Sequence, residues 1–227
     1  TPIPRLAKFI SQVEKKTPFR VAFTTAVNAM FTRIAPYVGN FGLRLVMANL
    51  WLFRPLLKKV MPMISPQAAA MLQTSIAFTM QAGSAGYNVL PQEASVCANM
   101  RYIPHQGTDE SIEVITELAK KFGLETEVIY RGYPSKSLDL EGEAFAITQN
   151  TIKTCFPDIG ILPYVVTGGT DARFYDEVAD SCVRFSPVNY GPEQMAGMHG
   201  LNENIEIGTL PAAVDFYKEI ILAQEKR

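Results

Sequence analysis

The chain has 227 residues, of which 48% are hydrophobic and 10% aromatic, and its formal net charge is −1. This composition excludes a disordered tail, and the length accommodates one large domain or two small ones. The cysteines, Cys97, Cys155 and Cys182, share no metal-type spacing and indicate reduced thiols in a cytoplasmic protein. Residues 1–64 hold ten lysines or arginines against one acid, Glu14. We interpret this basic third as a segment that docks on an acidic domain of its own protein, and not on nucleic acid.

Two helices are predicted at the start of the chain. Leu6, Phe9 and Val13 recur at helical spacing, with basic residues between them, and predict an amphipathic helix over 3–16. A second and more apolar helix is predicted over 19–35, where a proline and then a glycine follow.

The most hydrophobic run of the chain covers residues 41–60. Charged residues, an asparagine and a proline interrupt it, so no stretch approaches the ~20 apolar residues that a membrane span needs. We interpret the run as part of a helical insertion, about residues 19–72, that packs on a neighbouring domain. A helix lying on a membrane surface around Trp51 and Phe53 is the less favoured alternative.

After this insertion the spacing of the apolar residues changes from a helical to an alternating pattern. The elements predicted here are a strand at 74–81, a strand at 95–102, a helix at 109–122 and a strand at 124–131. Thr108 is placed to cap the helix, and Gly123 is placed to close it. Together with the helix at 3–16, this order is most of a ferredoxin-like βαββαβ unit whose first strand would lie upstream of Thr1.

A polar stretch over 133–140 indicates a domain boundary. The elements predicted beyond it are a helix at 143–155, a strand at 161–166, a helix at 172–178, a strand at 182–186 and a helix at 210–225. This alternation predicts part of an α/β domain, too short to be a complete one.

Two short motifs in this second part carry the residue types of a binding site. Gly168-Gly169 follows an apolar run and precedes Thr170, Asp171 and Arg173, so a ligand can approach the backbone closely at the start of a helix. The guanidinium of Arg173 suits a carboxylate. His199, in the later motif 198–203, supplies a single metal ligand, whereas a zinc site needs three or four.

These motifs resemble the C-terminal end of the M20 zinc peptidases and amidohydrolases. The glycine turn with Arg173, the sequence Arg184-Phe185-Ser186-Pro187 and the block around His199 occur in the family's order. Residues 86–91 and 98–101 are similar to the motifs of the family's lid domain. The resemblance is greatest to the branch of carboxypeptidase S, Gly-Xaa carboxypeptidase and PM20D1-like N-acyl amino acid hydrolases.

The resemblance implies an α/β fold in two parts. Residues 1–133 would form the lid or dimerisation domain, of α+β ferredoxin-like type with the helical insertion at about 19–72. Residues 134–227 would form the C-terminal portion of an α/β catalytic domain. The chain is therefore expected to be a fragment of a longer enzyme that forms a homodimer through its lid.

The activity that the resemblance implies is zinc-dependent cleavage of the amide bond in an N-acyl amino acid or short peptide with a free carboxylate. His199 matches the terminal ligand of a site with two zinc ions. Asn88 and Arg101 of the lid, and Thr170 and Arg173 of the glycine turn, match residues that hold the carboxylate end of the substrate.

The other zinc ligands and the general-base glutamate of the family have no match in this sequence. The chain alone is therefore expected to be inactive and to retain no zinc. The alternative is a non-catalytic dimerisation or interaction module, which would use the basic helices and an exposed strand edge.

Overall fold

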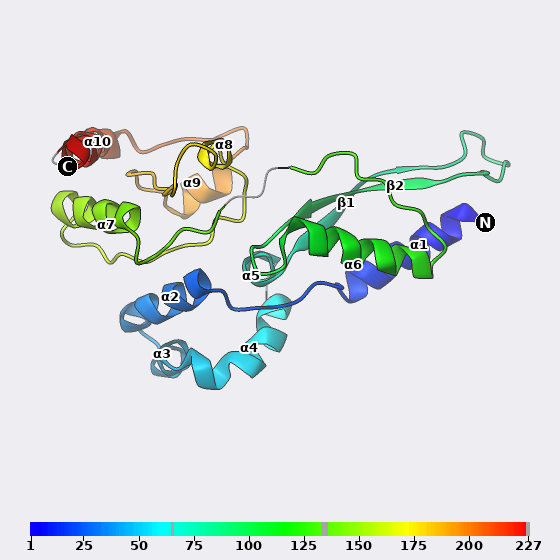
Figure 1. Ribbon diagram of the computed structural model, residues 1–227, viewed down its shortest axis with the longest axis horizontal. Helices are drawn as coiled ribbons and strands as arrows, with labels where there is room; N and C mark the ends of the chain where they lie inside the picture. Colours follow the sequence, from blue (N-terminus) through cyan, green and yellow to red (C-terminus); the bar gives the residue numbers. More distant parts are fainter. Residues whose placement is uncertain (65, 133–135, 226–227) are drawn as a thin grey trace. The chain divides into compact units, whose positions relative to one another are not determined.

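The computed structural model describes residues 1–64, 66–132 and 136–225. The chain forms two compact units, each of which is described by itself: unit 1 is Thr1–Ser135 with Pro163–Arg173, and unit 2 is Lys136–Leu162 with Phe174–Arg227. Many helices and one small sheet make up the fold, which confirms the predicted α/β class (Figure 1). The predicted domain boundary between residues 133 and 134 lies outside the described residues and stays a prediction.

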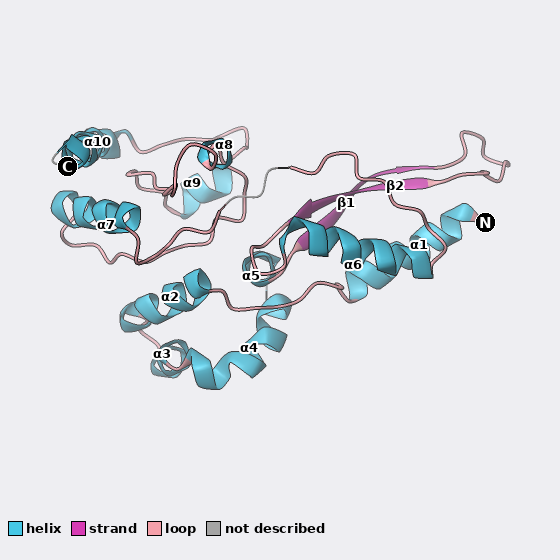
Figure 2. Ribbon diagram, in the orientation of Figure 1, coloured by secondary structure: helices cyan, strands magenta, loops and turns pink. Residues whose placement is uncertain are grey.

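Unit 1 contains a sheet and two helices that pack on it. Strands β1 (Ser75–Ala82) and β2 (Ser95–Arg101) pair antiparallel from Ser75↔Arg101 to Ala82↔Ser95. Helices α1 (Pro2–Lys15) and α6 (Gly107–Lys121) bury their apolar stripes with side chains of this sheet (Figure 2). The buried residues of this hairpin cluster are Phe9, Val13, Phe19, Ile115 and Ala119. The predicted helices at 3–16 and 109–122 and the predicted strands at 74–81 and 95–102 are confirmed.

Of the two predictions for the ends of α6, one is wrong and the other is confirmed. The predicted cap, Thr108, is wrong, because the helix already begins at Gly107, whose φ is +66°, and Gln106 is the residue before it. The predicted closure at Gly123 is confirmed. Its φ is +67°, and Leu124 N donates to Ala119 O at 3.1 Å across the end of the helix.

The helical insertion lies in unit 1. Its elements are α2 (Thr25–Ile34), the 3₁₀ turn η1 (Ala35–Tyr37), α3 (Phe41–Ala48), α4 (Leu50–Ile64) and α5 (Pro66–Leu72). They pack around an insertion cluster of Phe23, Val27, Leu50 and Leu72. Within the part of the chain that the structure describes, no helix is both long and apolar enough to cross a membrane.

One predicted bound in the insertion is wrong, and the hydrophobic run forms two helices instead of one continuous element. The helix predicted over 19–35 begins only at Thr25, because Ala22 N donates to Leu72 O at 2.8 Å and the Thr24 hydroxyl accepts from Val27 N as the helix cap. The run 41–60 is broken at Asn49, whose side-chain amide donates to Leu45 O at 2.9 Å and so ends α3.

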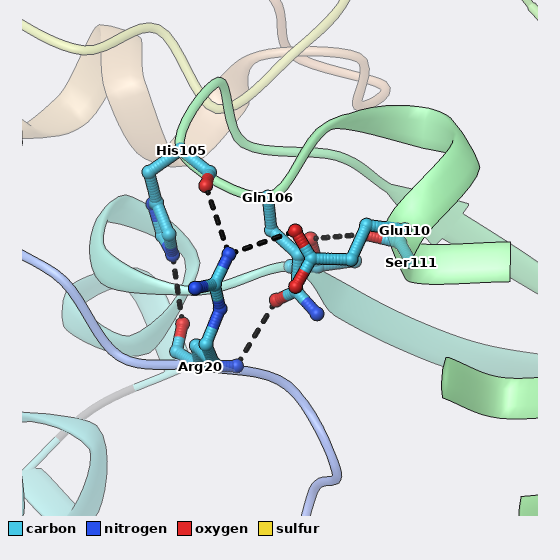
Figure 3. A network of polar contacts seen from close by, with 6 residues as sticks. Arg20, His105, Gln106, Glu110 and Ser111 are labelled. Atoms are coloured by element: carbon cyan, nitrogen blue, oxygen red, sulfur yellow. Dashed lines mark hydrogen bonds and ion pairs between the residues drawn. The ribbon is translucent and has the colours of Figure 1, made fainter. Parts of the chain in front are cut away.

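A set of hydrogen bonds, which we call the polar clip, joins the irregular segment before α2 to the start of α6 (Figure 3). Arg20 N donates to Gln106 Oε1 at 3.0 Å, and Arg20 Nη2 donates to His105 O and to Glu110 Oε2. His105 Nε2 donates to Arg20 O at 2.9 Å. His105 itself is half-buried. Beside the clip, the hydroxyls of Thr74 and Ser111 share a buried hydrogen bond of 3.1 Å.

The strands predicted over 124–131, 161–166 and 182–186 are wrong. In the described ranges the only sheet is β1–β2, and none of these three segments belongs to it. An apolar or alternating run becomes a strand only where a neighbouring strand supplies hydrogen bonds, and these segments remain irregular without one.

Unit 2 is built on two helices that pack together. Helices α7 (Glu143–Cys155) and α10 (Leu210–Glu225) have the bounds that the sequence predicts. Phe216 of α10 is 2% exposed, and its ring lies 4.9 Å from Phe185 and 6.4 Å from Phe156, centroid to centroid. The shorter elements that accompany them are α9 (Pro192–Gly197) and the 3₁₀ turn η2 (Ile207–Thr209). The short helix α8 (Ala172–Tyr175) begins in unit 1 and ends in unit 2. The helix predicted over 172–178 is therefore only one turn long.

Candidate functional site

The glycine turn at Gly168 and Gly169 belongs to unit 1 and contacts the rest of that unit at two points. Val165, just before the turn, packs on the insertion cluster. Arg101, the last residue of β2, donates from Nη1 to Thr167 O at 3.0 Å. The structure thus brings Arg101 to the turn that Gly168 and Gly169 form, although 66 positions separate Arg101 from Thr167 in the sequence.

A second guanidinium lies at the same turn. A Cβ atom on Gly169 would come within 3.1 Å of Arg173 Nη1, so Arg173 lies back over the turn instead of extending away from it. Gly168 has open space where its Cβ would be. Thr170 is half-buried, and its carbonyl accepts from Arg173 N at 3.3 Å. Two positive charges beside an open glycine backbone form an arrangement that suits a carboxylate.

Asn88 is placed apart from this group. It is exposed in the turn that connects β1 to β2, beyond the Ala82↔Ser95 pair. Arg101 pairs with Ser75 at the opposite end of the hairpin. At about 3.4 Å per residue, the eight-residue strand β1 separates the two ends by roughly 20 Å or more. The structure therefore joins Arg101 with Arg173 and Thr170 but not with Asn88, whose role stays a prediction.

Tyr102 adds a polar group next to Arg101 in the chain, and sequence reasoning did not identify it. Burial raises the pKa of its phenol above the ordinary value, and the charge of Arg131 opposes this shift. Arg131 itself pairs with Asp109 at 2.7 Å. The neutral phenol has a hydroxyl that can donate a hydrogen bond.

His199 lies in unit 2, on a tight turn after α9. Its side chain is exposed, and its φ of 61° lies in the left-handed region that few non-glycine residues adopt. Gly200 N donates to Gly197 O at 2.8 Å across the turn, and a Cβ atom on Gly197 would come within 3.0 Å of Asn202 O. A strained backbone that exposes an imidazole is typical of a functional position.

Polar contacts hold the chain on both sides of this turn. Gln194 of α9 donates from Nε2 to Asn204 Oδ1 at 3.0 Å, and Asn189 donates from Nδ2 to Glu206 Oε2 at 3.2 Å. The two contacts connect the segment before His199 to the segment after it. The turn is thus a closed loop that fixes where the imidazole leaves the backbone.

The described residues do not fit a complete metal centre. Nowhere in the described ranges do three or more His, Cys, Asp or Glu side chains gather as metal ligands would. A zinc ion takes three or four protein ligands in its usual sites, so the imidazole of His199 is one ligand of a centre that needs others.

Comparison with known proteins gives a family match over most of the chain. The sequence profile of peptidase family M20/M25/M40 matches residues 12–223. The N-fatty-acyl-amino acid synthase/hydrolase PM20D1 of Xenopus tropicalis is 30% identical over 223 residues, which cover 97% of this chain and 43% of that protein. A probable carboxypeptidase S-like protein 2 of Dictyostelium discoideum is 29% identical over 228 residues, 97% of this chain and 42% of that protein.

A more distant relative matches a smaller part. A succinyl-diaminopimelate desuccinylase of Stenotrophomonas maltophilia is 29% identical over 144 residues, 63% of this chain and 36% of that protein. The chain thus spans less than half the length of these curated relatives. No solved structure matches it.

Proposed function

Because the chain belongs to peptidase family M20/M25/M40, we propose that it forms the carboxylate-binding part of a metal-dependent amide-bond hydrolase. The names of its relatives refer to N-fatty-acyl-amino acids, to a carboxypeptidase and to succinyl-diaminopimelate. Substrates of these three kinds have a free carboxylate near the amide bond that is cut. The proposed substrate is accordingly an N-acyl amino acid or a short peptide.

The observation that supports this proposal most is the bond from Arg101 to Thr167. It holds one guanidinium at the glycine turn, where Arg173 supplies a second. Binding of the substrate carboxylate between the two would fix the scissile amide at a set distance from this end. Positioning of this kind lowers the entropic part of the reaction barrier.

In this proposal His199 holds one of two zinc ions. When bound, such ions supply an activated water and polarise the scissile carbonyl. The remaining ligands and the general base would come from residues that this chain does not contain, so the chain alone would have no amidase activity. The residues here bind and orient the substrate, and they contribute one imidazole to the metal.

A non-catalytic dimerisation module is the second candidate function. Strands β1 and β2 form a two-stranded sheet, and a sheet edge with unpaired backbone groups can pair with another copy. Homodimerisation through unit 1 is compatible with both candidates, whereas only the hydrolase needs Arg101 to recognise a carboxylate.

The test is carboxylate recognition by the intact enzyme. Arg101→Ala should lower kcat/KM for an N-acyl amino acid about 10- to 100-fold, since a charge-assisted hydrogen bond is lost, and should leave turnover of the corresponding N-acyl amino acid amide unchanged. Arg131→Ala, which removes an exposed guanidinium paired with Asp109, is the matched control and should change neither rate. Equal losses on both substrates would show that Arg101 only supports the fold, and the proposal would then fail.

A further inference from the structure

The outer surface of α3 and α4 exposes large apolar side chains. We call this surface the α3–α4 face and define it by Phe41, Leu43, Leu45, Trp51, Leu52, Leu56 and Met63. Phe41, Trp51 and Met63 are 75%, 74% and 84% exposed. These exposed apolar side chains lie on two helices that follow each other in the chain, and exposed apolar surface of this kind is typical of interaction sites.

Helix α4 is apolar on both of its sides. Leu50, Leu57 and Met61 recur on one side and pack into the insertion cluster. Leu52 and Leu56 lie on the opposite side and are 57% and 59% exposed. The outer side of α4 thus exposes apolar side chains that a partner with an apolar surface would cover.

The partner must also be anionic. No Asp or Glu occurs between Glu14 and Glu93, a range that contains the whole insertion. Lys58 and Lys59 are exposed on α4. Arg44 of α3 is exposed too, and its Nε and Nη2 donate to Val38 O at 3.0 and 2.9 Å, which keeps the guanidinium beside the face. A second copy of the chain docked face to face would bring these like charges together, which disfavours self-association here.

The position of Lys59 favours a lipid surface over an acidic protein as the partner of this face. Lys59 follows Leu56 by three residues and precedes Met63 by four, so it lies within the apolar stripe of α4 and not at its rim. Lysine is depleted from the centre of protein–protein interfaces. On a bilayer its long stem lies among the acyl chains while the ammonium group reaches the lipid phosphates. This placement favours a lipid surface over the acidic protein surface that the sequence analysis preferred.

We propose that the α3–α4 face binds the surface of bilayers that contain anionic phospholipids. The helices would lie in the plane of the interface. At about 1.5 Å per residue, the 15 residues of α4 extend roughly 22 Å, which is shorter than the ~30 Å hydrocarbon core. Trp51 is of the residue type that concentrates at the headgroup level.

The chain carries its own reporter, because Trp51 is its single tryptophan. We would titrate the full chain with phosphatidylcholine vesicles and with vesicles that contain phosphatidylglycerol, and follow Trp51 emission. The proposal predicts a blue shift with the anionic vesicles, weaker binding at high salt, and quenching by lipids brominated in the upper acyl chain. Pure phosphatidylcholine should bind at least about tenfold more weakly.

Two double variants of the α3–α4 face and one control double variant on α6 test the proposal. Lys58→Glu with Lys59→Glu should weaken binding to anionic vesicles at least about tenfold, whereas Lys120→Glu with Lys121→Glu, the same charge change on α6, should change it less than about twofold. Leu52→Ser with Leu56→Ser should weaken binding to a similar degree, and circular dichroism would confirm that each variant retains its helices.

Three results would overturn the proposal. One is an unchanged Trp51 emission with both kinds of vesicle. Another is equal weakening by the α4 and α6 lysine pairs, which would make the attraction a property of the net charge. The third is a Trp51 that is blue-shifted and protected from acrylamide before any lipid is added, since a protein surface would then cover the face.

Discussion

Gly123 shows how much a single residue can specify when its role is local. A glycine directly after a helical pattern predicts a left-handed closing residue, and the structure has φ = +67° there. The start of the same helix was not predictable in this way, because the Gln106 side chain accepts from Arg20 N, a residue 86 positions earlier. A closing residue depends on its own helix, whereas this helix start depends on a distant segment.

Gly123→Ala should therefore destabilise unit 1. The left-handed conformation costs a residue with a Cβ atom about 1 kcal/mol, and the new Cβ would lie 3.4 Å from Arg5 Nη1. Urea unfolding would measure the change in the free energy of unfolding. Gly39→Ala is the control, since nothing lies within 4 Å of its Cβ position and its φ is not positive, and it should change stability by less than about 0.5 kcal/mol. Equal effects of the two substitutions would contradict this account of Gly123.

At the scale of elements, helices were predictable and strands were only partly so. The bounds of α7 and α10 follow from the spacing of apolar residues such as Phe145, Ile152 and Phe216, because a helix makes its hydrogen bonds within itself. The apolar run at 161–166 has the length and composition of a strand, yet it packs through Val165 without a strand beside it. No local pattern shows whether such a partner exists.

The polar clip gives a test of how the insertion is attached. Gln106 is 5% exposed and accepts from Arg20 N, so Gln106→Ala leaves a part-buried N–H without its acceptor and should cost about 1–3 kcal/mol of unfolding free energy. Glu110→Ala removes the ion pair to the same arginine, but both side chains are largely exposed, so the expected cost is below about 1 kcal/mol. Denaturant unfolding of the two variants, measured under the same conditions, gives this order, and the reverse order would refute the Gln106 contact as the main attachment within the clip.

At the scale of the whole molecule, the sequence predicted the class and the family, while the site was predictable only in part. The sequence motif predicted Arg101, Thr170 and Arg173, and the structure gathers these three at one turn. Pro163–Arg173 groups with unit 1 through packing between segments that are distant in the sequence, which no local pattern can indicate. Asn88 resembles a lid residue in its motif alone, and its place in the hairpin turn is set by the strand register.

At the same scale, the metal centre stays a proposal that rests on one candidate ligand. One imidazole, His199, is held on a strained and tightly bonded turn, and the described part of the chain adds no cluster of further ligands to it. The chain spans less than half the length of these curated relatives.

The measurement that tests the central claim most directly is zinc content together with N-acyl amino acid hydrolysis, both in the intact protein. The two histidines of the chain provide the variants. His199→Ala should lose bound zinc and reduce hydrolysis at least about a hundredfold, since a direct ligand contributes more than the groups that merely orient one. His105→Ala should keep both, because His105 only bonds to Arg20 in the clip. If His199→Ala kept its zinc and its full rate, the chain would not be part of the proposed hydrolytic site.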